Sequence, residues 1–543
     1  MSGRVKSLTA LRGRQRIVTL KTSKTAPNRS WQVDRDREND GVDGTGELNV
    51  GTIHFLVPHA NIQSELPEIQ AAYMSGIDGH IFPTRVSYEA GSLDFNKPTA
   101  DSCKLNIAWP IPGWGRPIIR TASLSERQST YILTVELARG KLSETKDQRA
   151  VWENSGMNVP PEYLKLEQEA FRFFRQAACH QDDINEATRL AEQSLSKSLQ
   201  ATEFLLKAYV AQRMAFRRQK SNSSMVSLGC FITGDSVQDS WLEELSIGFS
   251  SVGVPLNWKL TEPTEGHVQW ETADRLVEWC QEHRVMPYGG PLLDLSAEGL
   301  PSWLLYYQQD PTHMQDLICH YVESVTSRYL GKIRNWEIIA RANSGGAPGF
   351  SEESRLTMAA RVIDIARQID DENQLFIRVD QPWGAYQGRG THRLSPFQFV
   401  DALLRSGIGL TGVNLEIAMG YQMVGAGFRD LLDMSRLIDL WSTLGVPLYV
   451  TLAYPASREV DAKASSRVKV TPDQWRLSWS DDSQAEWIDQ VLPMLLAKQA
   501  IVGVFWSHIA DGQQHFYPNS GFIRPDGTTR PSLAHFVNRN VIS

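Results

Sequence analysis

The feature that most constrains the fold is an alternation of β-like runs with amphipathic helical stretches, from about residue 227 to residue 540. Each run is followed by a stretch with helical spacing of its apolar residues, for example residues 351–369 and 429–444. Eight such repeats predict an α/β fold, a (β/α)8 TIM barrel, whose site lies at the C-terminal ends of its strands. The runs cover residues 227–233, 249–256, 284–288, 333–339, 374–379, 409–417, 447–453 and 501–507.

Three parts precede this barrel, which we place at residues 226–543. Residues 1–48 are basic and polar with almost no apolar periodicity, so we expect a disordered tail, with a nucleic-acid arm as the alternative. Residues 49–142 contain β-rich runs at 52–57, 104–109 and 130–137 between Gly/Pro turns, which predict a small sandwich-like domain. Residues 143–225 predict a helical hairpin or linker, broken near residues 180–183 and docked on the barrel flank.

The Pro/Gly-rich segment at residues 109–115 carries two tryptophans, Trp109 and Trp114. Their rings could offer flat faces to a sugar, as in carbohydrate-binding modules. The alternative is that they pack against the neighbouring domain, which buries more apolar surface.

Composition excludes several classes of protein. The net charge of -7 over 543 residues leaves no basic excess to suggest nucleic acid as a partner. The amino terminus lacks the apolar core of a secretory signal, and no apolar run is long enough to cross a membrane. We therefore expect a cytoplasmic protein without a membrane partner.

The five cysteines, Cys103, Cys179, Cys230, Cys280 and Cys319, are scattered and show no C-x-x-C spacing. This distribution supports neither a disulfide framework nor a zinc site. We expect buried thiols, no metal and no cofactor.

Residues 334–343 resemble an inner barrel strand that runs out into the working face. Ile338 and Ile339 form a β-branched core behind Trp336, and polar residues follow abruptly. The next residues, 344–349, are glycine-rich, as loops at a site often are.

Several motifs in the last part of the chain resemble glycoside hydrolase family 10, the xylanase family. The most specific covers residues 257–266 and Asp274, which resemble the family's K-W-x-x-T-E-P-x-x-G stretch and a later aspartate. Further matches are Pro301-Ser302-Trp303, Gln484-Ala485, and Trp506 with Asp511. The resemblance implies a family 10 barrel acting on or binding an oligo- or polysaccharide.

The same resemblance places the family's acid/base at Arg341 and its nucleophile at Leu452, and the asparagine before the acid/base at Ala340. Retaining glycosidases need two carboxyl groups about 5–5.5 Å apart. An arginine with a pKa above about 12 is no useful general acid at neutral pH. The resemblance therefore implies that the standard mechanism is absent.

Polar and aromatic residues nevertheless gather near the predicted strand ends. Three hypotheses follow: a degenerate barrel that binds a glycan or partner, an active glycosidase with relocated carboxylates, and a scaffold whose charges pair with one another. Candidate catalytic residues for the second hypothesis are Glu416, Asp380 and Asp511. Candidate substrate-binding residues are Trp258, Asp294, Trp303, Arg341, Trp383, Tyr421, Trp506 and His508.

Arg341 also makes a specific prediction about the site. A guanidinium at the barrel mouth keeps its charge, and an unpaired buried charge costs several kcal/mol. We therefore expect a direct ion pair between Arg341 and either Asp380 or Glu416, on the neighbouring strands. Glu337 lies deeper in its strand, and we expect it to be structural.

Overall fold

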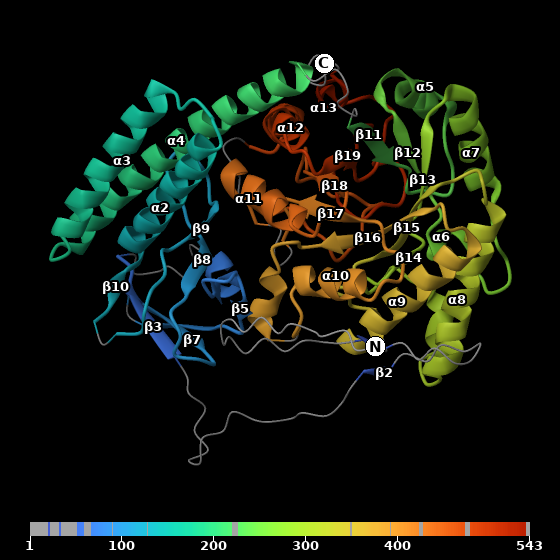
Figure 1. Cartoon of the computed structure of the whole chain (residues 1–543), viewed down its shortest axis with the longest axis horizontal. Helices are drawn as coiled ribbons and strands as arrows, with labels where there is room; N and C mark the ends of the chain where they lie inside the picture. Colours follow the sequence, from blue (N-terminus) through green and yellow to red (C-terminus); the bar gives the residue numbers. More distant parts are fainter. Residues whose placement is uncertain are drawn as a thin grey trace, which may run out of the picture.

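The computed structural model describes residues 51–58, 67–89, 91–127, 129–219, 226–347, 350–390, 392–422, 427–472 and 478–538, and the backbone of residues 20–21 and 32–33. The tail predicted at residues 1–48 lies outside these ranges, except for the paired strands β1 (Leu20–Lys21) and β2 (Gln32–Val33). A β-rich unit and three long helices lie beside an α/β barrel (Figure 1).

The β-rich unit contains two four-stranded sheets, in the orders β10-β3-β7-β6 and β5-β4-β8-β9. Trp109 and Trp114 are buried in its core, so these rings pack inside the protein and are not offered to a sugar. The elements are β3 (Gly51–Leu56), η1 (Pro67–Ala71), β4 (Tyr73–Ser75), β5 (Ile81–Phe82), β6 (Arg85–Glu89), β7 (Ser92–Lys97), β8 (Lys104–Ala108), β9 (Ile118–Arg120) and β10 (Tyr131–Ile132).

Residues 130–137 are not the strand that their β-branched run predicts. Only β10 pairs with β3, and helix α2 (Leu133–Asn154) begins directly after it. Leu133 and Leu137 are four residues apart, both fully buried, and Thr134 Oγ1 lies 3.0 Å from Thr188 Oγ1 of the helix packed against α2. Packing of one helical face outweighs the β propensity of this stretch.

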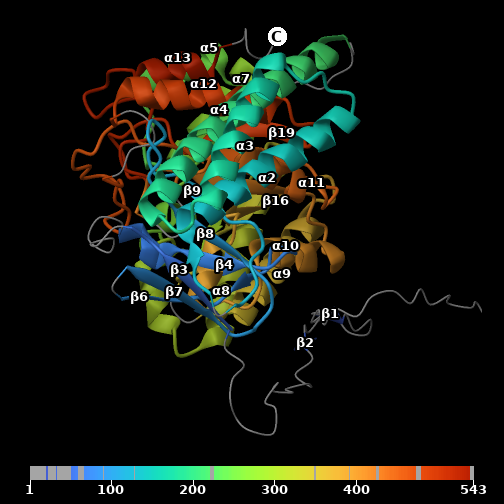
Figure 2. The ribbon, with the colours of Figure 1, turned by 90° about the vertical axis from the view of Figure 1, so that its left-hand side faces the viewer.

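The predicted helical hairpin is present as α3 (Pro161–Cys179) and α4 (Ile184–Gln219), with the break at residues 180–183. Leu205 and Leu206 of α4 and Trp152 of α2 belong to the same buried cluster as the barrel core. Figure 2 shows α2, α3 and α4 lying across the flank of the barrel. The predicted docking of the long helices is therefore confirmed.

A buried ion-pair group joins α2 to the barrel. Lys141 Nζ lies 2.9 Å from Glu144 Oε2 and 2.8 Å from Asp430 Oδ2, and the lysine side chain is 1% exposed. Asp430 is also the N-cap of barrel helix α11, since its side chain accepts hydrogen bonds from Leu432 N and Asp433 N. The division into parts at residues 48, 142 and 225 stays a prediction, and α2 runs through residues 142 and 143 without a break.

Eight parallel strands close the barrel, because β11 pairs with both β12 and β19, and β13 pairs with both β12 and β15. Each of the eight predicted runs overlaps one of these strands. They are β11 (Ser227–Phe231), β12 (Ser251–Val254), β13 (Met286–Gly289), β15 (Asn335–Ala340), β16 (Gln374–Asp380), β17 (Gly412–Ala418), β18 (Leu448–Ala453) and β19 (Ile501–Trp506). A short extra strand, β14 (Leu293–Asp294), pairs with β15 near the mouth.

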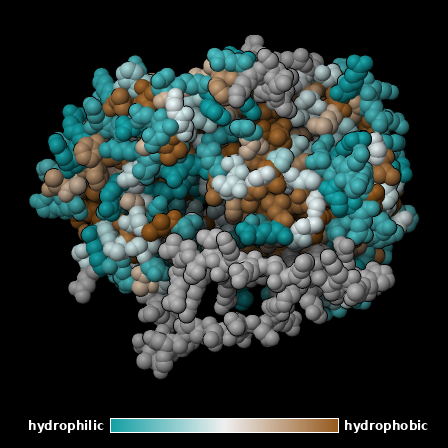
Figure 3. Space-filling model, in the orientation of Figure 1, coloured by the Kyte–Doolittle hydropathy of each residue, from teal (hydrophilic) through white to brown (hydrophobic). Residues whose placement is uncertain are grey.

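Helices cover the outside of this barrel, as the alternating pattern predicts. They are α5 (Asp239–Gly248), α7 (Glu271–His283), α8 (Pro311–Arg328), α9 (Glu352–Ile369), α10 (Pro396–Arg405), α11 (Leu431–Ser442), α12 (Asp481–Leu496) and α13 (Pro531–Phe536). The short helices α6 (Trp258–Thr261), η2 (Ser302–Tyr307) and η3 (Ala385–Arg389) follow β12, β14 and β16. Figure 3 shows hydrophilic residues mainly toward the two sides of the drawn face and hydrophobic residues near its centre. Within the described residues, no helix combines the length and apolarity needed to cross a membrane.

A layer of aromatic rings fills the lower barrel interior. Phe231 lies 5.1 Å from Phe505 and 5.8 Å from Tyr288 between ring centroids, and the same cluster includes Phe376 and Tyr449. Glycines at neighbouring strand positions leave room for these rings, since an added Cβ at position 229, 253, 412 or 503 would overlap one of them. The rings form the floor on which the polar residues of the mouth lie.

Candidate functional site

Four charged side chains meet at the C-terminal ends of β14, β15, β16 and β17. Asp294 and Asp380 are the last residues of β14 and β16, Glu416 lies in β17 beside Asp380, and Arg341 follows β15 directly. Arg341 adopts a φ of +58°, a left-handed conformation that is uncommon for a residue with a side chain. The chain therefore turns at Arg341, at the barrel mouth.

The guanidinium of Arg341 bridges two carboxylates. Its Nη2 donates to Glu416 Oε1 at 2.7 Å and its Nη1 donates to Asp294 Oδ2 at 2.6 Å. The predicted ion pair with Glu416 is confirmed, and Asp294 is a second partner that the sequence reasoning did not name. Asp380 instead accepts a hydrogen bond from Ser344 Oγ at 2.6 Å.

A second arginine lies one layer deeper. Arg378 Nε lies 2.6 Å from Glu337 Oε1, and its guanidinium carbon lies 4.3 Å from the centroid of the Phe231 ring. Glu337 also accepts a hydrogen bond from Asn414 Nδ2 at 2.6 Å and has no exposed surface. These contacts agree with the structural role that we expected for Glu337.

Burial controls the protonation of the mouth carboxyl groups. It raises the pKa of Glu416 above the ordinary value for glutamate, although Arg341 and Arg378 act in the opposite direction. Burial also raises the pKa of Asp380, against the effect of Arg341. For Arg341, burial opposes the charge, but Asp294 and Glu416 outweigh it and hold its pKa above the ordinary range for arginine.

A cluster of histidine and aspartate residues lies beside this mouth, in the segment after β19. His508 Nε2 lies 2.9 Å from Asp511 Oδ1, and His515 Nε2 lies 3.0 Å from Asp461 Oδ2. The two imidazole rings stack with centroids 4.1 Å apart. Burial lowers the pKa of His508 to about 4, whereas Asp461 outweighs burial at His515 and raises its pKa.

A cavity of about 480 Å³ opens above the aromatic floor. Asp294, Arg341, Glu416 and His508 line it, together with residues 462–466 from the loop after β18 and residues 514–517 from the segment after β19. A second cavity, of about 500 Å³, contains Asp380, Tyr386 and His392 on the other side of Phe516.

A bridge of hydrogen bonds runs across the mouth between the two cavities. Glu298, which follows β14, pairs with Arg467 of the loop after β18 at 2.9 Å and accepts a hydrogen bond from Ser465 Oγ at 3.1 Å. Glu298, Arg341 and Phe516 line both cavities. The loop after β18 thus forms a roof over part of the barrel mouth.

Residues 251–514 match the sequence model of Glycosyl hydrolase family 10. The barrel is therefore a glycosyl hydrolase family 10-like barrel. The chain is 29% identical over 256 residues to Endo-1,4-beta-xylanase C of Paenibacillus barcinonensis, a match that covers 43% of this chain and 23% of that protein. It is 20% identical over 200 residues to Endo-1,4-beta-xylanase 5 of Arabidopsis thaliana, covering 36% of this chain and 34% of the relative. The chain thus spans about a third or less of the length of these relatives.

Solved xylanase structures are also similar to this chain. Xylanase 10B from Thermotoga maritima matches with a TM-score of 0.44 and 14% identity, covering 60% of this chain and 98% of that one. Xylanase XynB from Paenibacillus barcinonensis matches with a TM-score of 0.44 and 15% identity, covering 59% and 97%.

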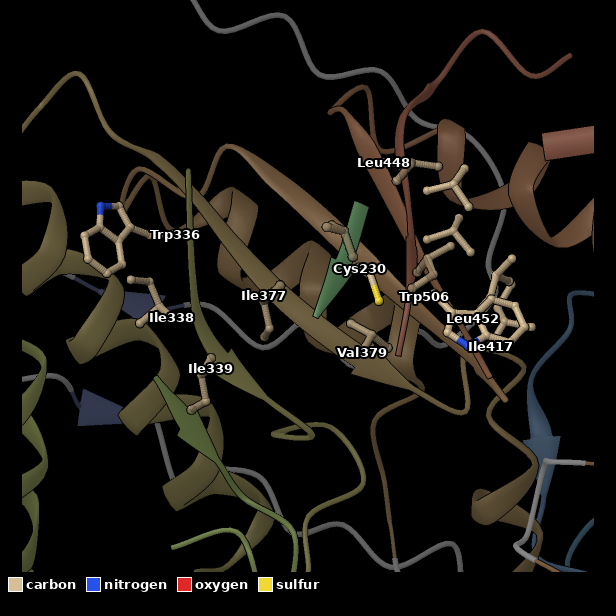
Figure 4. Packing of buried hydrophobic residues seen from close by; sticks show 14 of the residues in the cluster. Cys230, Trp336, Ile338, Ile339, Ile377, Val379, Ile417, Leu448, Leu452 and Trp506 are labelled. Atoms are coloured by element: carbon tan, nitrogen blue, oxygen red, sulfur yellow. The ribbon is translucent and has the colours of Figure 1, made fainter. Parts of the chain in front are cut away.

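Leu452, to which the family resemblance assigns the nucleophile position, lies outside the polar mouth. It pairs in register with Ile417 of β17 and with Trp506 of β19, and it has no exposed surface. Figure 4 shows the three side chains close together in the hydrophobic packing of the family 10 barrel. Leu452 belongs to the buried apolar cluster of the barrel.

The aromatic residues predicted to bind substrate lie mostly in the packing around the mouth. Trp258 stacks on Tyr321 at 4.9 Å, and its Nε1 donates to Glu262 Oε2 at 2.7 Å. Trp303 donates to Glu262 O at 2.9 Å. None of the five predicted rings lines either mouth cavity: Trp258, Trp303, Trp383, Tyr421 and Trp506.

Trp506, Tyr421 and Trp383 are held by other contacts. Trp506 Nε1 donates to Ser520 O at 2.7 Å, Tyr421 Oη donates to Pro518 O at 3.4 Å, and the ring of Trp383 lies 4.5 Å from the guanidinium carbon of Arg429. Asp511 lies in the histidine cluster and forms an ion pair with Arg530 at 2.6 Å. The mouth therefore brings together Asp294, Arg341, Asp380, Glu416 and His508, but not these rings or Asp511.

The sequence reasoning missed Phe516, Tyr517 and His515, which line the cavity of about 480 Å³. Phe516 is half-buried and its ring lies 4.1 Å from the guanidinium carbon of Arg341. All three lie in the loop after β19, where neither strand nor helix periodicity gives a signal. The only hint in the sequence is the density of aromatic and histidine residues at 515–517.

Proposed function

We propose that this family 10 barrel binds a saccharide at the C-terminal ends of its strands and does not hydrolyse it by the two-carboxylate mechanism. The observation that carries the proposal is the position of the Arg341 guanidinium, buried between Asp294 and Glu416. A retaining pair needs one carboxyl group free to donate a proton and another free to attack the sugar. Here a fixed cation occupies the space between two carboxylates.

The remaining acidic group of the mouth supports the same proposal. Asp380 accepts hydrogen bonds from Ser344 Oγ at 2.6 Å and from Gln381 Nε2 at 3.3 Å, and it is 4% exposed. A carboxylate held in this way reaches a substrate only after these bonds rearrange. Both carboxylate oxygens of Asp380 thus have hydrogen-bond partners in this arrangement.

The cavity is suited to a neutral, hydroxyl-rich ligand. Its volume of about 480 Å³ lies within the ordinary range of small-molecule sites, roughly 300–1,000 Å³. Asn257, Lys259 and Ser507 offer hydrogen-bonding groups, and Phe516 offers an aromatic ring on which a sugar face can stack. Because the named relatives are endo-1,4-beta-xylanases, β-1,4-linked xylo-oligosaccharides are the first ligands to test.

The alternative function is a glycosidase that uses relocated carboxylates. One observation favours it: Asp380 and Glu416 are register neighbours on β16 and β17, and burial raises the pKa of both, as a general acid requires. Asp511 is a weaker candidate, because Arg530 and His508 lower its pKa despite burial.

One experiment separates the two functions. Purified protein is titrated calorimetrically with xylotetraose, and the release of reducing ends from xylotetraose and xylan is followed in the same preparation. We expect saturable binding without release, and affinity weakened about tenfold in Phe516→Ala, equivalent to about 1.4 kcal/mol. Asp316→Asn, an exposed substitution on α8, is the matched control and leaves binding unchanged.

Release of reducing ends that is abolished by Glu416→Gln or Asp380→Asn would refute the proposal in favour of relocated carboxylates. If the protein neither binds xylotetraose nor releases reducing ends, the barrel acts as a scaffold. The cytoplasmic location and the absence of nucleic-acid and membrane partners stay predictions.

A further inference from the structure

We propose that His508, Asp511 and His515, together with Asp461 from the loop after β18, bind a divalent transition-metal ion at the edge of the barrel mouth. Among the described residues, the first three form a buried group whose ligand atoms all lie within 4.8 Å of one another. Two imidazoles and one or two carboxylates form a donor set that suits zinc and its neighbours in the first transition row. This inference does not depend on saccharide binding.

The nitrogens opposite the candidate ligand atoms are already fixed. His515 Nδ1 lies 2.7 Å from Gln513 O, and His508 Nδ1 lies 3.1 Å from Ser507 Oγ. Histidines that bind metals ordinarily use the other ring N–H in this way, with a backbone carbonyl or a polar side chain as acceptor. The arrangement turns both Nε2 atoms toward the carboxylates.

Three of the distances among the candidate atoms are short enough for a single ion. Ligand atoms that are each about 2.1 Å from one ion lie at most about 4.2 Å apart. Asp511 Oδ1 lies 2.9 Å from His508 Nε2 and 3.9 Å from His515 Nε2, while Asp461 Oδ2 lies 3.0 Å from His515 Nε2. Since the two rings stack with an interplanar angle of 14°, at least one ring has to turn for both nitrogens to face the same ion.

The charges around His515 call for a cation at its Nε2. Both of its ring nitrogens face oxygen acceptors, the carbonyl of Gln513 and the carboxylate of Asp461. Without a metal, the ring has to carry two protons to satisfy both contacts. A metal ion replaces the Nε2 proton and can bind both carboxylates, while Arg530 keeps its contact with the other oxygen of Asp511.

The site is also reachable. His508 and His515 line the 480 Å³ cavity of the mouth, so an ion can enter from solvent. Asp461 belongs to the same loop as Ala464, which forms a bridge with His515, and Ser465 N donates to His515 O at 3.0 Å. A bound ion would therefore tie the roof of the mouth to the segment after β19.

The test uses the full chain, stripped of metal by dialysis against EDTA and then titrated with ZnCl2 by calorimetry. Metal retained after gel filtration is measured by mass spectrometry, and Co²⁺ is added in parallel because its visible spectrum reports coordination. We expect one zinc ion per chain and an affinity more than about tenfold weaker in His515→Gln and in Asp461→Asn. His535→Gln is the matched control, because His535 forms an exposed pair with Asp489 at 2.8 Å, and it should bind zinc as the parent does.

Several results would overturn the proposal. Zinc retention at the same level in the parent and in His515→Gln would assign the metal to another place. An absence of stoichiometric zinc and cobalt binding in the folded parent would show that a proton occupies the site. If His515→Gln fails to fold, the cobalt spectrum of the parent and its change in Asp461→Asn still decide the question.

Discussion

Arg341→Met is the substitution that tests the mouth most directly. It keeps an unbranched apolar stem about as long as that of arginine and removes the cation between Asp294 and Glu416. Removing one partner of a buried ion pair costs about 3–5 kcal/mol. We expect about 3 kcal/mol at neutral pH, the lower end, because Arg378 remains 3.7 Å from Glu416 and the Asp294 side chain is 13% exposed.

The loss of stability in Arg341→Met should be smaller in mild acid. In the parent protein burial already raises the pKa of Glu416, and losing Arg341 removes a charge that lowers it. A carboxyl group whose folded pKa lies above its unfolded value gives stability that is lost as the pH rises through the folded pKa. The variant should therefore recover stability, relative to the parent, as the pH falls from about 7.5 to about 5.

Thermal unfolding at a fixed heating rate measures this effect. At about 2.1 cal/mol/K per residue, a barrel of about 300 residues has an unfolding entropy of about 0.6 kcal/mol/K, so the expected fall in Tm is about 5 °C. The double variant Arg341→Met with Glu416→Gln should regain at least half of the loss and lose the pH dependence, since no buried carboxylate remains at that position. Arg361→Met is the control, because its pair with Asp316 is exposed and contributes less than about 1 kcal/mol.

The reasoning fails if Arg341→Met is as stable as Arg361→Met. It also fails if the second substitution gives no rescue, because the loss would then come from packing against Phe516 and not from an unpaired carboxylate.

Three further predictions concern the rest of the chain. Lys141→Met should lower the free energy of unfolding by about 3–5 kcal/mol and expose α2 to limited proteolysis, whereas the half-buried Lys197→Met should change it by less than about 1 kcal/mol. Burial raises the pKa of Glu144, but Lys141 and Arg120 outweigh burial and hold this pKa below its ordinary value. The contribution of Glu144 to the free energy of unfolding should therefore be lost as the pH falls below about 4.5. Thermal scans of Glu144→Gln should accordingly show a smaller fall in Tm with decreasing pH than scans of the parent. Gly253→Ala should destabilise the barrel by about 1–3 kcal/mol in denaturant titrations, because its Cβ overlaps a buried ring of β11.

The barrel and the helical hairpin could be predicted from the sequence because each repeats a simple pattern. Eight β-like runs, each with a helix, correspond to eight strands, and the Pro- and Gly-free stretch after residue 161 corresponds to α3 and α4. The prediction of a strand at residues 130–137 was wrong, because β-branched residues also fit a helix whose buried face packs well. The aromatic residues predicted to bind substrate lie near the mouth, but their rings are packed against other residues and do not line a cavity. The sequence shows that a residue lies near a strand end, but it does not show the direction in which its ring points.

The two partners of Arg341 show where such reasoning stops. Because a guanidinium keeps its charge at every accessible pH, an arginine at the mouth requires a buried carboxylate, and the order of the strands points to Asp380 on β16 or Glu416 on β17. Asp294 could not be named as a partner by the same argument, because it ends β14, a two-residue strand that lies outside the (β/α)8 repeat and pairs with β15 alone among the described strands. The second partner therefore depends on an irregular feature of the barrel. The ion pair with Asp294 also completes the pairing of Arg341, since with Glu416 alone one end of the guanidinium would lack a carboxylate.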